Sequence, residues 1–216
     1  TMARSLFEES VALFEEMGNK EDMAWALRNL GRVLFAQGDE ARAYALAEES
    51  LALCRELHDK ISSAYTLDLL GRFALSLGKM TTARSLLEEG LALFRELGTR
   101  RHVAQVLSHV ASVAAMQGDD TAAHALYEES LVLFRYVGDT RGLACCLQGW
   151  GAMIARQGEL TWAARLWGAA ETLSAVGGPQ RFSLPVEHTA YERTDYERTV
   201  STVRAQLGEQ AFAKAW

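Results

Sequence analysis

The sequence repeats itself with a period of forty residues. When it is written in rows of forty, successive rows carry the same kind of residue in the same column. One alanine column and two leucine columns run through five rows: Ala3, Ala43, Ala83, Ala123 and Ala163; Leu6, Leu46, Leu86, Leu126 and Leu166; Leu13, Leu53, Leu93, Leu133 and Leu173. A glycine recurs at Gly38, Gly78, Gly118 and Gly158. This period is typical of arrays in which each copy is a small unit that packs on its neighbours.

Each copy has the pattern of two amphipathic helices. In its first half, apolar side chains follow a spacing of three and four residues, as at Ala24, Leu27, Leu30 and Leu34. A second such stripe begins after the glycine, which favours a helix end because it adopts positive φ without a Cβ clash. We therefore expect helices at residues 3–17, 22–37, 41–57, 61–77, 81–97, 101–117, 121–137, 140–157 and 161–176.

These columns resemble the tetratricopeptide repeat. That family places a large residue, Leu-Gly and an apolar residue on its first helix, glycine at the turn, and alanine, an aromatic and a small residue on its second. The matching residues are Leu27, Leu30-Gly31, Leu34, Gly38, Ala43, Ala47 and Ser50 in one copy, and Leu147, Trp150-Gly151, Ile154, Gly158, Ala163 and Trp167 in another. The resemblance implies an all-α, right-handed superhelical solenoid of antiparallel helix pairs, in the variety with longer helices.

We expect the array to cover residues 1–178. It would consist of a half repeat at 1–20 followed by repeats at about 21–60, 61–100, 101–140 and 141–178. Gly177-Gly178-Pro179 interrupts the pattern at the end of the last copy.

Residues 179–216 are expected to form a linker and a C-terminal capping helix. Ser183-Leu184-Pro185 precedes a new helix that we expect from about Val186. On that helix a narrow apolar stripe consists of Tyr196, Val200, Val203 and Leu207. Such a stripe suits a cap, because a terminal element must cover one apolar face of the array and expose its other face to water.

Both ends of the sequence indicate a piece of a longer protein. The stretch from Tyr196 to Trp216 is similar to the C-terminal region of large bacterial signalling ATPases and transcriptional regulators of the MalT and LuxR-like type. This resemblance implies other domains of a parent protein as partners. The chain opens in the second helix of a repeat, so Leu6, Phe7, Val11 and Phe14 would lack a first-helix partner. We expect this open end to form a homo-oligomer.

Composition excludes several classes of protein. The chain has 216 residues and a formal net charge of −6, whereas a nucleic-acid-binding protein needs a surplus of Lys and Arg to neutralise phosphates. Charged or polar residues interrupt every apolar block, so we expect no membrane span. The three cysteines are too few for a disulfide framework and indicate a reducing compartment, the cytoplasm.

The sequence contains no catalytic constellation. It has no Walker-type phosphate loop, no His-Glu-x-x-His, no Cys-x-x-Cys and no Gly-x-Ser-x-Gly, so we expect neither an enzyme nor a cofactor. His102 and His109 could share a helix face, but without a third ligand nearby a packing or solvated role is favoured over a metal site. One of the adjacent Cys145 and Cys146 is expected in the core. The tryptophans Trp150, Trp162 and Trp167 are expected there too.

The variable positions on the first helices of the repeats are the candidate binding residues. In the family that this chain resembles, these helices line the concave surface. The corresponding groove residues here are Trp25, Arg28, Arg32, Phe35, Tyr65, Asp68, Arg72, Gln105, Ser108, His109 and Gln148. The three arginines with Trp25 and Tyr65 could hold a carboxylate or phosphate beside an apolar group. Alternatively, Arg32 and Arg72 pair with Asp68 and nearby glutamates and only hold the repeats in register.

The sequence therefore favours a non-enzymatic binding module. A peptide, protein segment or small effector would bind the concave surface and, in a full-length regulator, bias an NTPase core between two states. The alternative is a self-assembly or intramolecular scaffold without a groove ligand. Groove substitutions would barely affect such a scaffold, whereas substitutions on the open N-terminal face would disrupt it.

Overall fold

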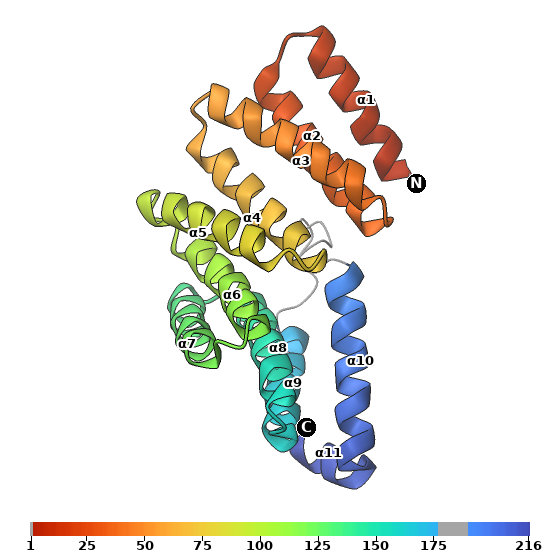
Figure 1. The fold of residues 1–216 in the computed structure, drawn as a ribbon, viewed down its shortest axis with the longest axis vertical. Coiled ribbons are helices and arrows are strands. Elements are labelled where there is room, and N and C mark those ends of the chain that lie inside the picture. The colour runs from red at the N-terminus through yellow and green to blue at the C-terminus, as the bar shows by residue number, and fades with distance from the viewer. Residues whose placement is uncertain (1, 177–189) are drawn as a thin grey trace. The chain divides into compact units, whose positions relative to one another are not determined.

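The computed structural model describes residues 2–176 and 190–216, and within these ranges every regular element is an α-helix (Figure 1). The helices are α1 (Met2–Glu16), α2 (Lys20–Ala36), α3 (Glu40–Glu56), α4 (Lys60–Ser76), α5 (Met80–Glu96), α6 (Arg100–Met116), α7 (Asp120–Val137), α8 (Thr140–Arg156), α9 (Leu160–Val176), α10 (Ala190–Leu207) and α11 (Glu209–Ala215). The nine helices expected in the array are confirmed, with ends within two residues of the predicted ones. None of the described helices combines the length and apolar character needed to cross a bilayer.

The chain divides into two compact units. Unit 1 is Thr1–Gly98 and holds α1 to α5, and unit 2 is Thr99–Trp216 and holds α6 to α11. Within unit 1, α2 packs against α3 and α4 against α5, while α1 packs on α2. Within unit 2, α6 pairs with α7 and α8 with α9. The all-α fold class of paired, consecutive helices is therefore confirmed.

Short turns join successive helices, and one residue in each of them has a left-handed backbone. Gly38 has φ of 85° there and Gly158 has φ of 87°. His58 occupies the equivalent position between α3 and α4 with φ of 54°, the one positive-φ residue among the described residues that is not glycine. A Cβ makes this conformation costlier by roughly 1–2 kcal/mol, so the turn at His58 is the strained member of the series.

The two helices of a pair cross closely where the repeat holds a small residue. Ser50 on α3 donates its hydroxyl to the carbonyl oxygen of Ala24 on α2 at 2.7 Å, and Ser130 makes the same bond to Ala104 in unit 2, also at 2.7 Å. At the equivalent Gly90, an added Cβ would lie 3.3 Å from the Cβ of Leu67. Small side chains in this column therefore permit the crossing.

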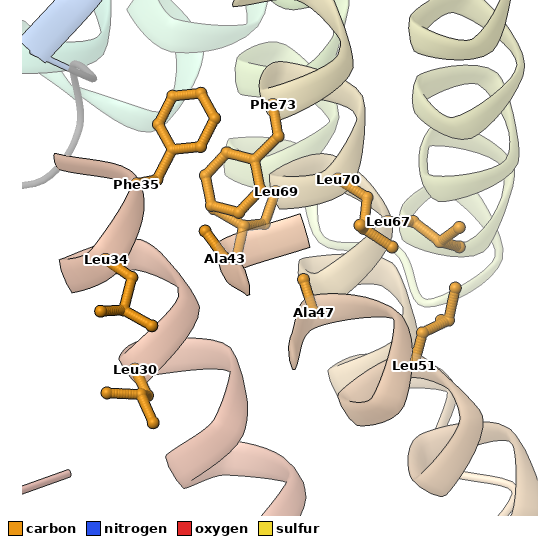
Figure 2. Packing of buried hydrophobic residues seen from close by; sticks show 10 residues of the cluster. All are labelled: Leu30, Leu34, Phe35, Ala43, Ala47, Leu51, Leu67, Leu69, Leu70 and Phe73. Carbon is orange, nitrogen blue, oxygen red and sulfur yellow. The ribbon is translucent and has the colours of Figure 1, made fainter. Parts of the chain in front are cut away.

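The core of unit 1 is built from the apolar stripes of α2, α3 and α4. Figure 2 shows the buried side chains of these helices directed into the space between them. Phe35 of α2 stacks on Phe73 of α4, with ring centroids 4.0 Å apart and an interplanar angle of 4°. Since Phe35 is 6% exposed and Phe73 is 1% exposed, this pair belongs to the packing that joins successive first helices.

In successive repeats, residues at the same positions near the helix ends contact each other, although the type of contact differs. Lys20 pairs with Glu56 and Lys60 pairs with Glu96, each with Nζ to Oε1 at 2.5 Å. In unit 2 the corresponding residues are Arg100 and Tyr136, and the guanidinium lies over the ring at 4.6 Å from its centroid. These contacts are exposed, so each contributes at most about 1 kcal/mol. They adjust a register that the packing of the helices establishes.

The C-terminal helices cap the last repeat within unit 2. Helix α10 packs on α8 and α9, and α11 returns to α9 (Figure 1). The predicted stripe faces this interface, because Val203 is 2% exposed and Tyr196, Val200 and Leu207 pack against Trp167 and its neighbours. The capping helix is thus confirmed. The interruption at Gly177-Gly178-Pro179 and the helix start expected near Val186 lie outside the described residues.

Two of the three tryptophans follow the prediction and one does not. Trp167 is fully buried and Trp150 packs against the core of unit 2. The prediction for Trp162 was wrong, because its side chain is 57% exposed. It lies one position before the buried Ala163, on the outward side of α9, where Arg165 places its guanidinium 5.2 Å from the indole centroid.

Replacing Gly151 by alanine should destabilise the protein. An added Cβ would lie 2.5 Å from Nε1 of Trp167, and this buried indole cannot retreat easily because it donates to the Gln148 carbonyl oxygen at 3.1 Å. Overpacking of this kind costs about 1–3 kcal/mol, which exceeds the gain of roughly 1 kcal/mol from better helix propensity. Urea unfolding followed by far-ultraviolet circular dichroism should show a lower midpoint for Gly151→Ala. The exposed Ser85→Ala on α5 is the control, and a raised midpoint for Gly151→Ala would contradict the close approach of α8 and α9.

Candidate functional site

Four predicted groove residues form a connected surface on the first helices of unit 1. We call this surface the arginine–aromatic face and define it as Trp25, Arg28 and Arg32 of α2 with Tyr65 of α4. The α2 residues are spaced by three and four, which places them on one side of that helix. Helices α2 and α4 are in contact, so the side chains of both contribute to one face.

Arg28 links the two helices of the arginine–aromatic face. Its guanidinium lies 5.5 Å from the ring centroid of Tyr65, and its Nη1 donates to the carbonyl oxygen of Ser62 at 3.5 Å. Burial lowers the pKa of the Arg28 guanidinium from its usual value, while nearby Cys54, Tyr65 and Asp59 act in the opposite direction. An arginine keeps its charge at neutral pH even so. The face therefore presents a partly desolvated cation, which binds an anion more strongly than a fully hydrated one.

Trp25 and Arg32 flank this cation. Trp25 is 47% exposed and packs one edge on Phe7 of α1, with ring centroids 5.7 Å apart. Asn29 joins them: its Nδ2 donates to the Trp25 carbonyl oxygen at 2.8 Å, and its Oδ1 accepts from Nη1 of Arg32 at 3.2 Å. An accessible indole thus lies on the same helix face as two held guanidiniums.

Three other predicted groove residues of unit 1 are buried. Phe35 is 6% exposed, Asp68 is 8% exposed and Arg72 is 4% exposed. Phe35 is part of the core through its stack on Phe73, so its size serves packing. None of the three offers a freely accessible side chain, which separates them from the four residues of the arginine–aromatic face.

In unit 2 the predicted positions carry smaller or half-buried polar residues. Ser108 donates its hydroxyl to the Gln105 carbonyl oxygen at 2.7 Å, within α6 itself. His109 is half-buried on the same helix. Gln148 on α8 lies beside Tyr196 of the capping helix, and its side chain hydrogen bond acts against the rise that burial causes in the Tyr196 pKa.

A pocket at the capping helix is a second candidate that sequence reasoning missed. This pocket, called the cap pocket here, has a volume of about 440 Å³ and is lined by Gln148, Glu171, Ser174, Tyr196, Glu197, Val200, Ser201, Arg204 and Trp216. Only Gln148 among these was predicted as a site residue. A signal was present in the sequence, because Glu171 and Ser174 depart from columns that are apolar in every earlier copy.

The buried thiols are not activated, and the described residues contain no metal-ligand cluster. Burial raises the pKa of the Cys146 thiol to about 12 and also raises that of Cys54, so both are protonated near neutral pH. Cys146 is buried and Cys145 is half-buried, in line with the expectation that one of the two belongs to the core. Across the described ranges, no three His, Cys, Asp or Glu side chains lie together in a way that could hold a metal ion.

Comparison with known families identifies the repeat. The sequence model of the tetratricopeptide repeat matches residues 1–56 and 61–135. The chain belongs to the tetratricopeptide repeat family. Tetratricopeptide repeats generally mediate protein–protein interaction and are typically non-catalytic. No curated protein matches this tetratricopeptide repeat chain in sequence.

Solved structures share the fold at low sequence identity. BtubC (BKLC) from P. vanneervenii is 17% identical with a TM-score of 0.72, over 99% of this chain and 85% of that one. A putative kinesin light chain of Podosopora anserina with nearly identical TPR-like repeats is 17% identical with a TM-score of 0.60, over 82% of this chain and 88% of that one. Its Q17M variant is also 17% identical, with a TM-score of 0.62 over 81% and 86%. At this sequence identity, the three structures show that the fold is shared.

Asp59, the N-cap residue of α4, lies near the arginine–aromatic face and should make the stability of the protein depend on pH. Burial raises the pKa of Asp59, but hydrogen bonds from Ser62 and Ile61 and the charge of Arg28 outweigh it, so the net pKa is lowered. A lowered folded-state pKa stabilises the fold above the ordinary value of about 3.9, and this stabilisation is lost as pH falls through the folded-state value. Asp59→Asn keeps the cap without the charge. Its thermal midpoint should be slightly below wild type at pH 7 and equal to it at strongly acidic pH.

The control is Asp59→Ala, which removes the accepting oxygen that lies 3.0 Å from the Ser62 amide nitrogen. Loss of an N-cap costs about 1 kcal/mol, so this variant should be less stable than Asp59→Asn at every pH. A constant difference between wild type and Asp59→Asn across the acid range would contradict the lowered pKa of Asp59.

Proposed function

We propose that this chain is an interaction module that binds a protein segment on the arginine–aromatic face. The observation that carries the proposal is the combination of a half-exposed indole with the guanidiniums of Arg28 and Arg32 on one side of α2. Guanidiniums hold carboxylates through paired N–H donors, and an indole beside them covers an apolar neighbour. The favoured ligand is thus a peptide with a carboxylate next to an aromatic or aliphatic side chain.

The burial of Asp68 and Arg72 refines this proposal. Arg72 takes the place of Arg32 one repeat later, but at 4% exposure its role is closer to holding the repeat register than to contacting a ligand. Arg28 and Arg32 keep part of their surface accessible. The peptide contact therefore centres on α2, with Tyr65 of α4 as its far edge.

The wider context is also proposed. The similarity of the Tyr196–Trp216 stretch to bacterial signalling regulators favours a cytoplasmic parent protein with an ATPase core and a transcriptional output. In such a protein, peptide binding on the array would shift the core between inactive and active states, a coupling of two sites through one equilibrium.

Peptide selection should test the arginine–aromatic face directly. We expect a phage-displayed library of random peptides, panned against the wild-type chain, to yield sequences with Asp, Glu or a free carboxyl end next to an apolar residue. Each selected peptide is then titrated by fluorescence anisotropy against Arg28→Gln, Arg32→Gln and Trp25→Ala. A hydrogen bond to a charged group contributes about 1.5–3 kcal/mol, so each arginine variant should bind roughly tenfold more weakly.

Arg135→Gln is the matched control, because this substitution removes the same positive charge from an exposed arginine of α7 in unit 2. It should bind the selected peptides like wild type. Unchanged affinity in the Arg28 and Arg32 variants would reject the arginine–aromatic face as the binding surface.

The alternative function is self-assembly, which one observation favours. Helix α1 carries an uncovered apolar stripe made of Met2, Leu6 and Leu13, which are 82%, 53% and 51% exposed, and Met17, directly after the helix, is 72% exposed. In α3 the equivalent leucines, Leu46 and Leu53, are half-buried. An apolar stripe on a helix is typical of a surface that pairs with another helix.

If α1 is an assembly surface, the chain should form dimers or larger species as its concentration rises. Light scattering coupled to size-exclusion chromatography should then show a mass that increases with concentration for wild type. Leu6→Glu and Leu13→Glu should reduce it to the monomer mass, whereas Val132→Glu on the exposed face of α7 should not. A monomer at every concentration would reject this alternative and leave peptide binding on the arginine–aromatic face unaffected.

A further inference from the structure

The last copy of the repeat changes two columns that are apolar in all earlier copies. The first column runs through Val11, Leu51, Leu91 and Leu131 and becomes Glu171. The second runs through Phe14, Cys54, Phe94 and Phe134 and becomes Ser174. In the earlier copies most of these side chains are core residues: Leu51 and Leu91 are each 6% exposed, and Phe94 and Phe134 are 2% and 3% exposed. Val11, Phe14 and Leu131 are half-buried. Helix α9 therefore presents a carboxylate and a hydroxyl where its predecessors present packing side chains.

The two changes open the cap pocket. In the preceding copy the ring of Phe134 fills the space directly over Gly142 on α8, where even an added methyl group would clash with it. Ser174 has no ring to place against the capping helix α10, and both Ser174 and Glu171 line the pocket instead. A volume of about 440 Å³ accommodates one long side chain of a bound peptide with room for water.

The chemistry of the cap pocket favours a cation. Two carboxylates, Glu171 and Glu197, line it together with the rings of Tyr196 and Trp216. The Trp216 indole donates to Oε2 of Glu171 at 2.5 Å, which orients this carboxylate. A carboxylate can accept about four hydrogen bonds, so Glu171 retains capacity for N–H donors of a ligand. Aromatic faces add attraction for a positive charge.

The chain's own Arg204 also lines the pocket and makes contacts with α11. Its guanidinium lies 4.7 Å from the ring centroid of Phe212, and its Nε lies 4.0 Å from Oε1 of Glu209. With Arg204 included, the side chains that line the pocket carry two negative charges and one positive charge, so Glu171 and Glu197 leave the lining net negative.

We propose that the cap pocket, where Glu171 and Ser174 of α9 meet Tyr196 of α10 and Trp216, binds the positively charged side chain of an arginine or lysine from a protein segment. The aliphatic stem lies along Val200 and Trp216, and the charged nitrogen reaches Glu171 and Glu197. This site is separate from the arginine–aromatic face, lies entirely within unit 2 and does not depend on the function proposed for unit 1.

Binding of small cationic probes to the intact chain tests the proposal. The indole N–H signal of Trp216, assigned by its loss in Trp216→Phe, is followed by NMR while N-acetyl-arginine amide or N-acetyl-lysine amide is added. We expect a saturable shift with at least one of them and binding roughly tenfold weaker with N-acetyl-citrulline amide, which has the arginine shape without the charge. Glu171→Gln should weaken binding by a similar factor. Higher salt should weaken it in wild type.

Two further variants separate binding from folding. Ser174→Phe restores the ring of the earlier copies and should abolish binding while the circular dichroism spectrum and unfolding midpoint are maintained or improved. Glu9→Gln is the matched control for Glu171→Gln, because it removes the same negative charge from an exposed residue of α1 in unit 1. This variant should bind the cationic probes like wild type.

The proposal is overturned if neither amide produces a saturable shift, if the citrulline compound binds equally well, or if Glu171→Gln or Ser174→Phe binds like wild type. Spermidine is titrated in parallel to test the source of the cation. Tighter binding of spermidine than of both amides would assign the pocket to a free polyamine and overturn the peptide source.

Discussion

The close crossing of the two helices in each repeat is the constraint on which this protein depends. It requires a small residue in a defined column, and Ser50 and Ser130 turn the short distance into a hydrogen bond from one helix to the backbone of the other. On either side of the crossing, large apolar residues pack between the helices. Exposed ion pairs at the helix ends then adjust a register that packing has already established.

The proposed binding surfaces use residues that the crossing leaves unconstrained. On α2 these are Trp25, Arg28 and Arg32, which keep accessible surface although neighbouring positions are packed. At the end of the array they are Glu171 and Ser174, where the columns that elsewhere supply the core change to polar residues. In both places an aromatic ring lies beside charged groups, positive on the arginine–aromatic face and negative in the cap pocket. The two surfaces therefore favour ligand groups of opposite charge.

The candidate site was only partly predictable. The repeat register indicated which positions face away from the crossing, and of these Arg28, Arg32, Trp25 and Tyr65 keep accessible surface. It also included Phe35, Asp68 and Arg72, which are buried. The stack of Phe35 on Phe73 shows that the first helices of successive repeats pack on each other there. A spacing of three and four residues shows which side of a helix a residue occupies, but not how closely the next helix covers that side.

The sequence by itself determined the repeat, the nine helices of the array with their turns, and the stripe on the capping helix, because these depend on local spacing and on small residues that the periodicity displays. Only the tertiary structure decided which groove residues remain accessible, since burial is set by side chains contributed from other helices. It also decided that Ser174 and Glu171 leave a pocket under α10, because an open space depends on what every surrounding helix fails to fill. The periodicity of the sequence shows which side of a single helix is apolar, whereas the burial of a residue depends on the packing of several helices.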